Sequence, residues 1–211
     1  DPSVMALWVK KAFRDAMTYP QGPVAIEIPR NIQSIRTTNS QQLGFVDNAF
    51  EEPLPSYGNP VAVEKAVKLL IGAERPVIAA GEDIFWTHAE DELKEFVELT
   101  STPVITRRVG RGAVPEDHPL AFGARARGAI LRRADVAMTI GLNLGFLEGY
   151  GAWAAKAKLI QITQSKSDIE TTTKVSVVII GNPKAVLQQM IDYVKKNYKQ
   201  GVAKKDAWLC E

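Results

Sequence analysis

The sequence predicts an α/β protein built on a parallel sheet of five or six strands with helices on both faces. Two observations support this fold class. Short, wholly apolar runs alternate with longer segments whose apolar residues recur every three or four positions. A strand that is apolar throughout is buried on both faces, and parallel strands need crossovers that return the chain to the same edge. The pattern therefore indicates three layers of helices, sheet and helices.

The elements follow in order along the chain. A helix is expected from Met5, and it must end before Pro20; a short strand is expected at 24–28. The alternating part predicts five further strands, at 76–81, 103–106, 135–140, 158–162 and 175–180. It predicts helices around 63–71, 93–97, 124–133 and 187–194. This order is that of a Rossmann-like three-layer sandwich.

The chain also shows domain boundaries. Residues 37–59 have no sustained apolar period and carry many Thr, Asn, Ser, Gln and Pro residues, so we interpret them as a linker. Residues 1–36 then belong to one domain and residues 60–196 to a second. The basic segment 197–211 is expected to begin another linker. Because the sequence starts with Asp1 and not with Met, we expect a piece of a longer polypeptide.

Composition narrows the function classes. The formal net charge of +2 gives no reason to expect nucleic acid or a membrane as the main partner. The single cysteine, Cys210, permits no intramolecular disulfide and no multi-cysteine metal site, which is typical of a reducing compartment. No apolar run approaches the roughly 20 residues that span a bilayer. We therefore expect a cytoplasmic protein.

Small and polar residues follow four of the predicted strands. They are Ala80 to Asp83, Thr106 to Gly112, Gly141 to Asn143, and Gly181 and Asn182. Ligands of open parallel sheets bind outside the carboxyl ends of the strands, so these ends predict a nucleotide-sized cleft. Each glycine alone is equally typical of a simple turn. The Gly-x-Gly-x-x-Gly fingerprint is absent, which disfavours an ordinary NAD dehydrogenase.

Seven arginines lie between Arg107 and Arg133. Guanidinium groups match phosphate oxygens, so Arg107 or Arg127 is expected to contact a phosphate. Arg133 is expected on a solvated helix end and outside the site. The two histidines, His88 and His118, stand far apart, and no nucleophile motif occurs. We therefore expect neither a metal site nor a catalytic residue in this sequence.

An ordered set of short motifs resembles one enzyme family. The motifs are Gly-Pro-Val-Ala-Ile-Glu-Ile-Pro at 22–29, Arg-Pro-Val-Ile-Ala-Ala-Gly at 75–81, Pro-Val-Ile-Thr at 103–106, Gly-Arg-Gly-Ala-Val-Pro-Glu-Asp-His-Pro at 110–119, Ala-Asp-Val at 134–136 and Gly-Asn at 181–182. In order and spacing the chain resembles thiamine-diphosphate enzymes of the acetolactate-synthase-like superfamily. The resemblance implies that 1–36 is the tail of a pyrimidine-binding domain, 60–196 the central domain, and 197–211 the start of a linker to a third domain.

The resemblance also implies cofactors. In the family, thiamine diphosphate and magnesium are held by a Gly-Asp-Gly motif in the third domain and activated by a glutamate early in the first, and neither feature occurs here. The fragment alone is therefore expected to be inactive. The central domain in this family holds FAD or ADP. Glu82, at a strand end, and Arg127, in the arginine cluster, are predicted as further residues of this cofactor site. The matching positions are Gly81, Arg107, Gly110, Gly141, Asn143, Thr163, Gln164, Gly181 and Asn182.

Departures from the acetolactate synthase pattern bear on the reaction. Leu142-Asn143-Leu144 follows Gly141 where those enzymes carry an arginine and aspartates, and Thr163 and Ser165 replace an acidic pair. These changes argue against acetolactate synthesis and, more weakly, against FAD. The resemblance implies a decarboxylase, lyase, synthase or diketone hydrolase, a homodimer or homotetramer, acting on a 2-oxo acid, a diketone or an acyl-CoA. A nucleotide-sensing module and a structural domain with an empty cleft remain alternatives.

Overall fold

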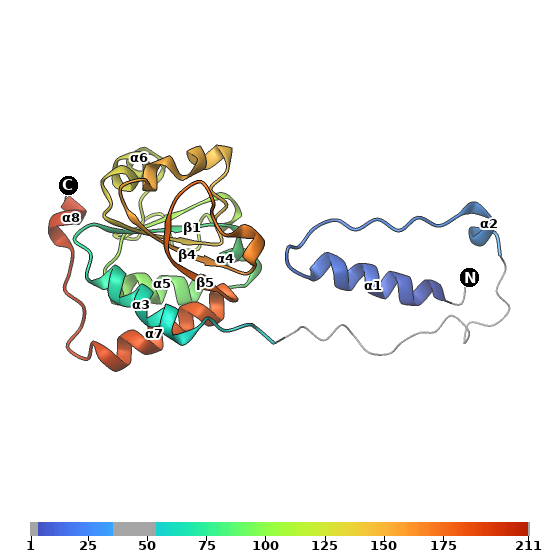
Figure 1. Cartoon of the computed structure of the whole chain (residues 1–211), viewed down its shortest axis with the longest axis horizontal. Coiled ribbons are helices and arrows are strands. Elements are labelled where there is room, and N and C mark those ends of the chain that lie inside the picture. Colours follow the sequence, from blue (N-terminus) through green and yellow to red (C-terminus); the bar gives the residue numbers. More distant parts are fainter. Residues whose placement is uncertain (1–3, 36–53, 211) are drawn as a thin grey trace. The chain divides into compact units, whose positions relative to one another are not determined.

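The protein divides into two compact units, Asp1–Leu54 and Pro55–Glu211. The computed structural model describes residues 4–35 and 54–210 (Figure 1). Most of the predicted linker, 37–59, therefore lies outside the described residues. Each unit is described separately below.

The first unit holds two helices, α1 (Met5–Met17) and α2 (Arg30–Gln33), with an extended segment between them. The predicted first helix is confirmed. The predicted strand at 24–28 is wrong, because the extended segment pairs with no other strand among the described residues. None of the residues in α1 is buried, and Trp8 and Phe13 remain 53% and 66% exposed.

The second unit contains one five-stranded parallel sheet. Its strands are β1 (Pro76–Ala80), β2 (Val104–Thr106), β3 (Val136–Ile140), β4 (Lys158–Thr163) and β5 (Val175–Ile180). Their order across the sheet is β2-β1-β3-β4-β5, and every neighbouring pair is parallel. The predicted fold class is confirmed, and the five strands of the alternating part fall where the apolar runs predicted them.

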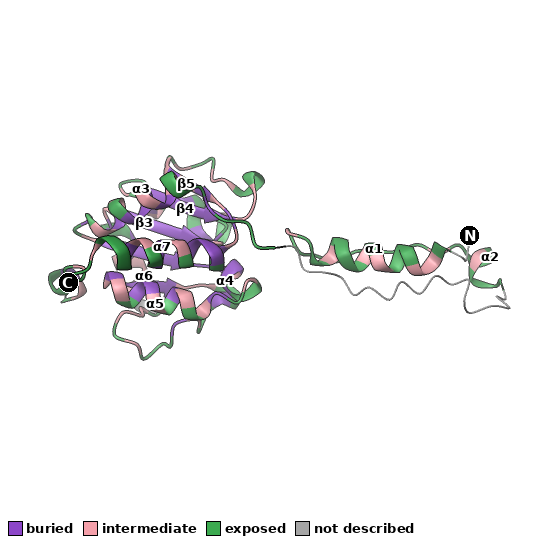
Figure 2. Ribbon diagram, turned by 90° about the horizontal axis from the view of Figure 1, so that it is seen from below, coloured by how far each residue is buried: buried purple, intermediate pink, exposed green. Residues whose placement is uncertain are grey.

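Helices cover both faces of this sheet (Figures 1 and 2). On one face, α3 (Pro60–Ile71), α5 (Glu90–Thr100) and α7 (Pro183–Asn197) pack on side chains such as Ile78 and Met138. On the other face, α6 (Ala124–Arg133) and the 3₁₀ segment η4 (Phe146–Ala154) pack on Val77 and Ala137. Successive strand residues point to opposite faces, so fully buried strands supply both cores at once.

Two helices begin with the same local signal. Asn59 and Asn182 accept hydrogen bonds from the first free amides of α3 and α7, and each is followed by a proline in the first turn. This pairing of Asn cap and proline stabilises a helix start. Several short elements were not predicted, among them α4 (Glu82–Trp86), η4 and α8 (Asp206–Cys210). Five-residue helices and irregular 3₁₀ segments are too short or irregular to show an apolar period.

Both ends of the second unit are tied to its body. Gly58 exchanges hydrogen bonds with the Gln189 side chain of α7, its N–H donating at 2.8 Å. At the other end, the Lys205 ammonium donates to the carbonyls of Ile71 and Ala73 at 3.1 and 2.6 Å. Trp208 is 7% exposed, and its indole N–H donates to the Pro76 carbonyl at 2.9 Å. The predicted linker 197–211 thus includes residues that pack on the sheet.

We predict that the C-terminal indole contributes measurably to stability. Trp208→Ala removes a buried ring and its hydrogen bond and should lower the free energy of unfolding by about 3–5 kcal/mol. Urea denaturation followed by circular dichroism measures this change. Trp86→Ala, at a half-exposed tryptophan, is the matched control and should cost less than about 1 kcal/mol. Equal effects of the two substitutions would show that the segment is not anchored.

Candidate ligand site at the carboxyl edge of the sheet

The strand order creates one natural site for a ligand. The chain leaves β1 toward β2 on one side and later returns to place β3 on the other side of β1. In open parallel sheets, the crevice at such a reversal opens at the carboxyl ends of the two strands. Here that point lies between Gly81, after β1, and Gly141, after β3. Both glycines were predicted as site residues.

Three glycines at this point pack against one another. A Cβ on Gly81 would collide with the Gly141 carbonyl, and a Cβ on Gly110 would collide with the Gly81 carbonyl. Gly141 has φ +53° and no room for a Cβ beside Asp83. The amides of Gly81, Gly110 and Gly141 already donate to backbone carbonyls at 2.8–3.0 Å. In this structure the glycines let three loops cross closely, and their N–H groups are used within the fold.

The last strand end is also covered by the chain. The amide of Gly181 donates to Thr163, and a Cβ at Gly181 would lie 3.0 Å from the Gly58 nitrogen. The Asn182 side chain caps α7, and the backbone N–H of Asn182 donates to the Ser56 carbonyl at 2.8 Å. Segment 56–58 therefore occupies the space above β5. Of the two residues predicted at the end of β4, Thr163 is the last residue of the strand and is buried, and Gln164 follows the strand and is partly exposed.

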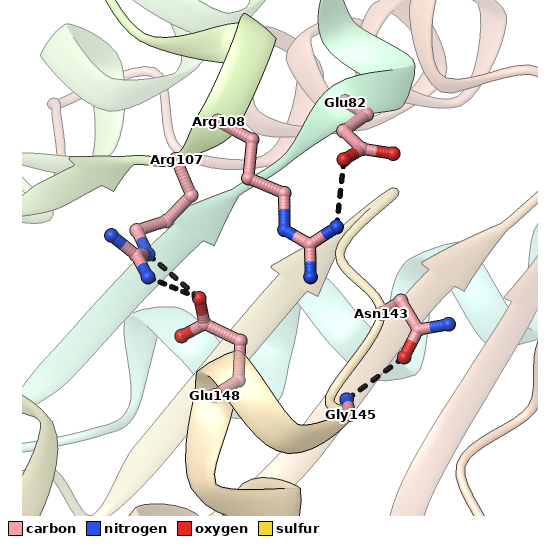
Figure 3. A network of polar contacts seen from close by, with 6 residues as sticks. All are labelled: Glu82, Arg107, Arg108, Asn143, Gly145 and Glu148. Atoms are coloured by element: carbon pink, nitrogen blue, oxygen red, sulfur yellow. Dashed lines mark hydrogen bonds and ion pairs between the residues drawn. The ribbon is translucent and has the colours of Figure 1, made fainter.

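Ion pairs join the loops around the reversal point (Figure 3). Both Nε and Nη2 of Arg107 donate to Oε1 of Glu148, at 2.8 and 2.5 Å. The Glu148 side chain is only 1% exposed and that of Arg107 is 24% exposed. Breaking this pair would leave a buried charge unpaired, at a cost on the order of 3–5 kcal/mol. Arg107, predicted to contact a ligand phosphate, is thus committed to a carboxylate of its own chain.

Arg108 makes a second and more open ion pair. Its Nη1 donates to Oε1 of Glu82 at 2.9 Å, and the two side chains are 31% and 42% exposed. Arg108 also has φ +53°, a left-handed backbone that is unfavourable for a residue with a side chain. This conformation carries the guanidinium from the end of β2 to the end of β1. Because the pair is solvated, an incoming anion could replace Glu82 at modest cost.

Asp83 is a second buried acid at the reversal point and, unlike Glu148, has no ion-pair partner among the described residues. It is 6% exposed, and its Oδ2 has no hydrogen-bond partner. Burial raises the pKa of Asp83, and the negative charges of Asp168 and Glu82 raise it further, while hydrogen bonding from Gln164 acts in the opposite direction. The carboxyl group therefore holds its proton to higher pH than an ordinary aspartic acid.

Not every predicted site residue lies at this edge. Glu82, Arg107 and Asn143 come together around the reversal point (Figure 3), where Asn143 accepts a hydrogen bond from the Gly145 amide at 2.8 Å. Arg127 instead lines a groove between α6 and η4. Asp83 and Arg108 belong to the strand ends identified in the sequence but were not assigned as site residues, and sequence reasoning missed Glu148. No local sequence pattern could predict that Arg107 pairs with Glu148, which lies 41 positions further along the chain.

Large apolar side chains gather on the segments that follow the first three strands. They are 44–79% exposed: Phe85, Trp86, Val109, Phe146, Leu147 and Tyr150. Two of them, Phe85 and Trp86, meet edge to face with ring centroids 5.0 Å apart. An apolar rim beside the Arg108–Glu82 pair suits a ligand with a planar ring and an anionic group.

The described residues offer no anchor for a metal ion. Among them no three His, Cys, Asp or Glu side chains cluster in a way that could hold one. The donors at the carboxyl edge are guanidinium and amide groups, which suit phosphate and not magnesium. The residues present therefore do not fit thiamine diphosphate with its metal. In the described part of the chain, no helix has the length and apolarity to cross a membrane.

The fold defines the class of protein: a doubly wound α/β domain, with a candidate ligand site at the carboxyl ends of its strands. Residues 63–190 match the family model described as the central domain of thiamine pyrophosphate enzymes. This match covers more than half of the chain, so the chain belongs to that family.

Three relatives illustrate the family. The chain is 28% identical to oxalyl-CoA decarboxylase of Escherichia coli over 199 residues, covering 93% of this chain and 35% of the relative. It is 30% identical to a probable acetolactate synthase large subunit of Methanococcus aeolicus (88% and 33% covered) and 28% identical to mouse 2-hydroxyacyl-CoA lyase 1 (89% and 32%). The chain spans about a third of the length of these relatives.

A solved structure supports the fold. The chain is similar to the X-ray structure of a protein from Mycobacterium smegmatis described as a thiamin diphosphate-dependent enzyme, with a TM-score of 0.69 and 18% sequence identity. The alignment covers 90% of this chain and 37% of that protein. At this identity the likeness bears on the fold alone.

We predict that Asp83 makes stability depend on pH. A pKa raised above its ordinary value of 3.8 means that the folded state binds the proton more tightly than the unfolded state. The associated stability is present below pH 3.8 and is lost as pH rises through the raised pKa. Asp83→Asn, which keeps the neutral shape, should therefore gain stability over the parent protein as pH rises from about 4 to 7.

Denaturant titrations across this pH range measure the effect. Asp117→Asn removes an exposed carboxylate and is the control for overall charge; its stability difference from the parent should stay nearly constant with pH. A constant difference for Asp83→Asn as well would contradict the prediction.

Proposed function

We propose that this chain is the central domain of an enzyme that makes or breaks a carbon–carbon bond next to a carbonyl group with the help of thiamine diphosphate. The family match over residues 63–190 carries the proposal. The relatives are named as a decarboxylase, a synthase and a lyase, and their substrates suggest a 2-oxo acid or an acyl-CoA. In this proposal residues 1–36 are the tail of a pyrimidine-binding domain, and the complete enzyme is a homodimer or homotetramer.

The first unit is consistent with that part of the proposal. Its helix α1 has no buried residue, and Trp8, Phe13 and Met17 are about half exposed or more. The segment 21–29 is extended without a partner strand among the described residues. An amphipathic helix beside an unpaired extended segment is the composition of a piece that completes a larger α/β domain.

We predict that the 211-residue chain by itself has no thiamine-dependent activity. The sequence contains no Gly-Asp-Gly motif, and its described residues hold no cluster of metal-binding side chains. Assays with thiamine diphosphate, magnesium and pyruvate, oxalyl-CoA or a 2-hydroxyacyl-CoA should show no product above the rate without protein. Turnover with any of these substrates would mean that the chain carries a complete catalytic site.

The proposed ligand of the carboxyl edge is an adenine nucleotide, either ADP or FAD. The support is the combination of a strand-order reversal, the solvated Arg108–Glu82 pair and the apolar rim that includes Trp86. Two further side chains with amide groups follow the next strands along this edge, Asn143 after β3 and Gln164 after β4. In the proposal Arg108 exchanges Glu82 for a phosphate oxygen, and Arg107 stays with Glu148 to hold the loop.

A structural domain without a nucleotide is the second candidate. One observation favours it: the backbone amides of Gly81, Gly110, Gly141 and Gly181 are all used within the fold. These four glycine amides are then not available to a phosphate. Binding measurements separate the two candidates.

We predict that Arg108 governs nucleotide affinity. Arg108→Ala removes a charge-assisted hydrogen bond worth about 1.5–3 kcal/mol and should weaken ADP binding roughly ten- to a hundredfold. Glu82→Gln frees Arg108 from its competitor and should tighten binding by a factor of about two to five. Calorimetric titration of the 211-residue chain with ADP, and separately with FAD, measures both changes.

Arg111→Ala is the matched control, because Arg111 lies in the same loop but pairs with Glu116 and is 71% exposed. Its effect on affinity should be less than about twofold. If neither ADP nor FAD binds, the edge is structural. If both bind but Arg108→Ala behaves like Arg111→Ala, the nucleotide binds without Arg108.

A further inference from the structure

A groove runs between α6 and η4, on the helical layer that packs against Val77 and Ala137. Its volume is about 540 Å³, within the range of sites for small molecules. Four of its ten lining residues belong to α6, namely Arg127, Gly128, Leu131 and Arg132, and the other six lie in 148–156. In Figure 1 this layer carries the label α6.

The charges of the groove are unbalanced. Three cations line it: Arg127, Arg132 and Lys156. Its one carboxylate, Glu148, is already paired with Arg107. Within the described part of the chain, no carboxylate forms an ion pair with any of the three cations. By contrast, Arg107, Arg108 and Arg111 in the preceding loop each pair with a glutamate.

Clustered cations without counter-charges repel one another and favour the binding of an anion. The backbone of α6 brings two of them together. Gly128 has no side chain, and the Arg132 guanidinium lies 3.3 Å from the point where a Cβ of Gly128 would stand. Arg132 therefore folds back along the helix, toward the turn that carries Arg127, and does not extend away from it.

The remaining wall is apolar. Leu131 is 3% exposed, and Ala152, Trp153 and Ala155 complete the lining. The indole N–H of Trp153 is shielded from solvent and has no hydrogen-bond acceptor among the described residues. A buried donor without a partner is uncommon and indicates a missing acceptor. Because Trp153 also lines the groove, a ligand bound there would lie against this indole ring.

We infer that this groove binds a small organic anion whose phosphate or carboxylate group meets Arg127, Arg132 and Lys156 and whose apolar part lies on Leu131 and Trp153. The site is separate from the proposed nucleotide edge, because it shares with it only Glu148, which Arg107 neutralises. Arg127, expected from the sequence to contact the nucleotide, belongs to this second site.

Phenyl phosphate is a suitable probe, since it joins a dianion to an apolar ring. Titration of the ¹⁵N-tryptophan-labelled chain, followed by ¹H–¹⁵N correlation spectra, should move the Trp153 indole peak, which Trp153→Phe identifies. We expect a Kd of about 1 mM or below. Inorganic phosphate, which buries no ring, should bind at least about fivefold more weakly. The indole peaks of Trp8, Trp86 and Trp208 should not move.

Substitutions in and outside the groove test whether phenyl phosphate binds there. Arg127→Ala and Arg132→Ala should each weaken phenyl phosphate binding about five- to tenfold without changing the melting temperature by more than a few degrees. Arg111→Ala, an exposed arginine outside the groove, and Arg108→Ala, at the nucleotide edge, should leave binding unchanged.

Three results would overturn the inference. One is a Trp153 peak that does not move with phenyl phosphate. Another is a loss of binding in Arg108→Ala as large as in Arg132→Ala, which would put the anion at the carboxyl edge. The third is a response to an oligo-glutamate peptide but not to phenyl phosphate, which would identify a protein-docking surface. Loss of ADP binding alone bears only on the proposed nucleotide edge.

Discussion

The close contact of three backbone loops at the reversal of strand order is the constraint on which the second unit depends. β1 pairs with β2 on one side and β3 on the other, so the loops that leave these strands must share one small space. Gly81, Gly110 and Gly141 make this possible, because no side chain fits between the loops. Gly141 must also adopt a left-handed backbone, which glycine reaches without strain. The edge is therefore rigid before any ligand arrives.

Ion pairs between charged side chains also hold the loops at this edge together. Arg107 reaches from the end of β2 to Glu148, which is almost fully buried, and so ties η4 to the sheet. The desolvation of both charges makes such a pair weak evidence for stability, but its two bonds to one carboxylate fix the loop's position. The ion pair of Arg108 with Glu82 is weaker because both side chains are partly exposed and water competes for their hydrogen bonds. Arg107 therefore fixes the position of η4, whereas Arg108 can exchange its partner for a ligand.

The arginines of residues 107–133 thus divide by environment. Those in the loop after β2 are neutralised by glutamates, whereas Arg127 and Arg132 of α6 face an apolar groove with Lys156. A single count of seven arginines hides this division. The electrostatic potential of the domain is expected to be strongest along α6, which carries four of the seven arginines, and weaker in the loop after β2, where glutamates neutralise the other three.

Much of the fold was determined by the sequence alone. Apolar runs placed all five strands of the sheet, and the Asn-Pro pairs at 59–60 and 182–183 set the starts of α3 and α7, because burial and capping act locally. The strand at 24–28 failed for the opposite reason: its residues favour an extended chain, but a strand exists only where another backbone pairs with it. Gly81 and Gly141 were predicted from the sequence to lie near a ligand, and that contact stays a prediction. The tertiary structure decided three other features: the contacts of these glycines with one another, the ion pair between Arg107 and Glu148, and the position of Arg127 in a different groove. These contacts join residues that lie far apart in the chain.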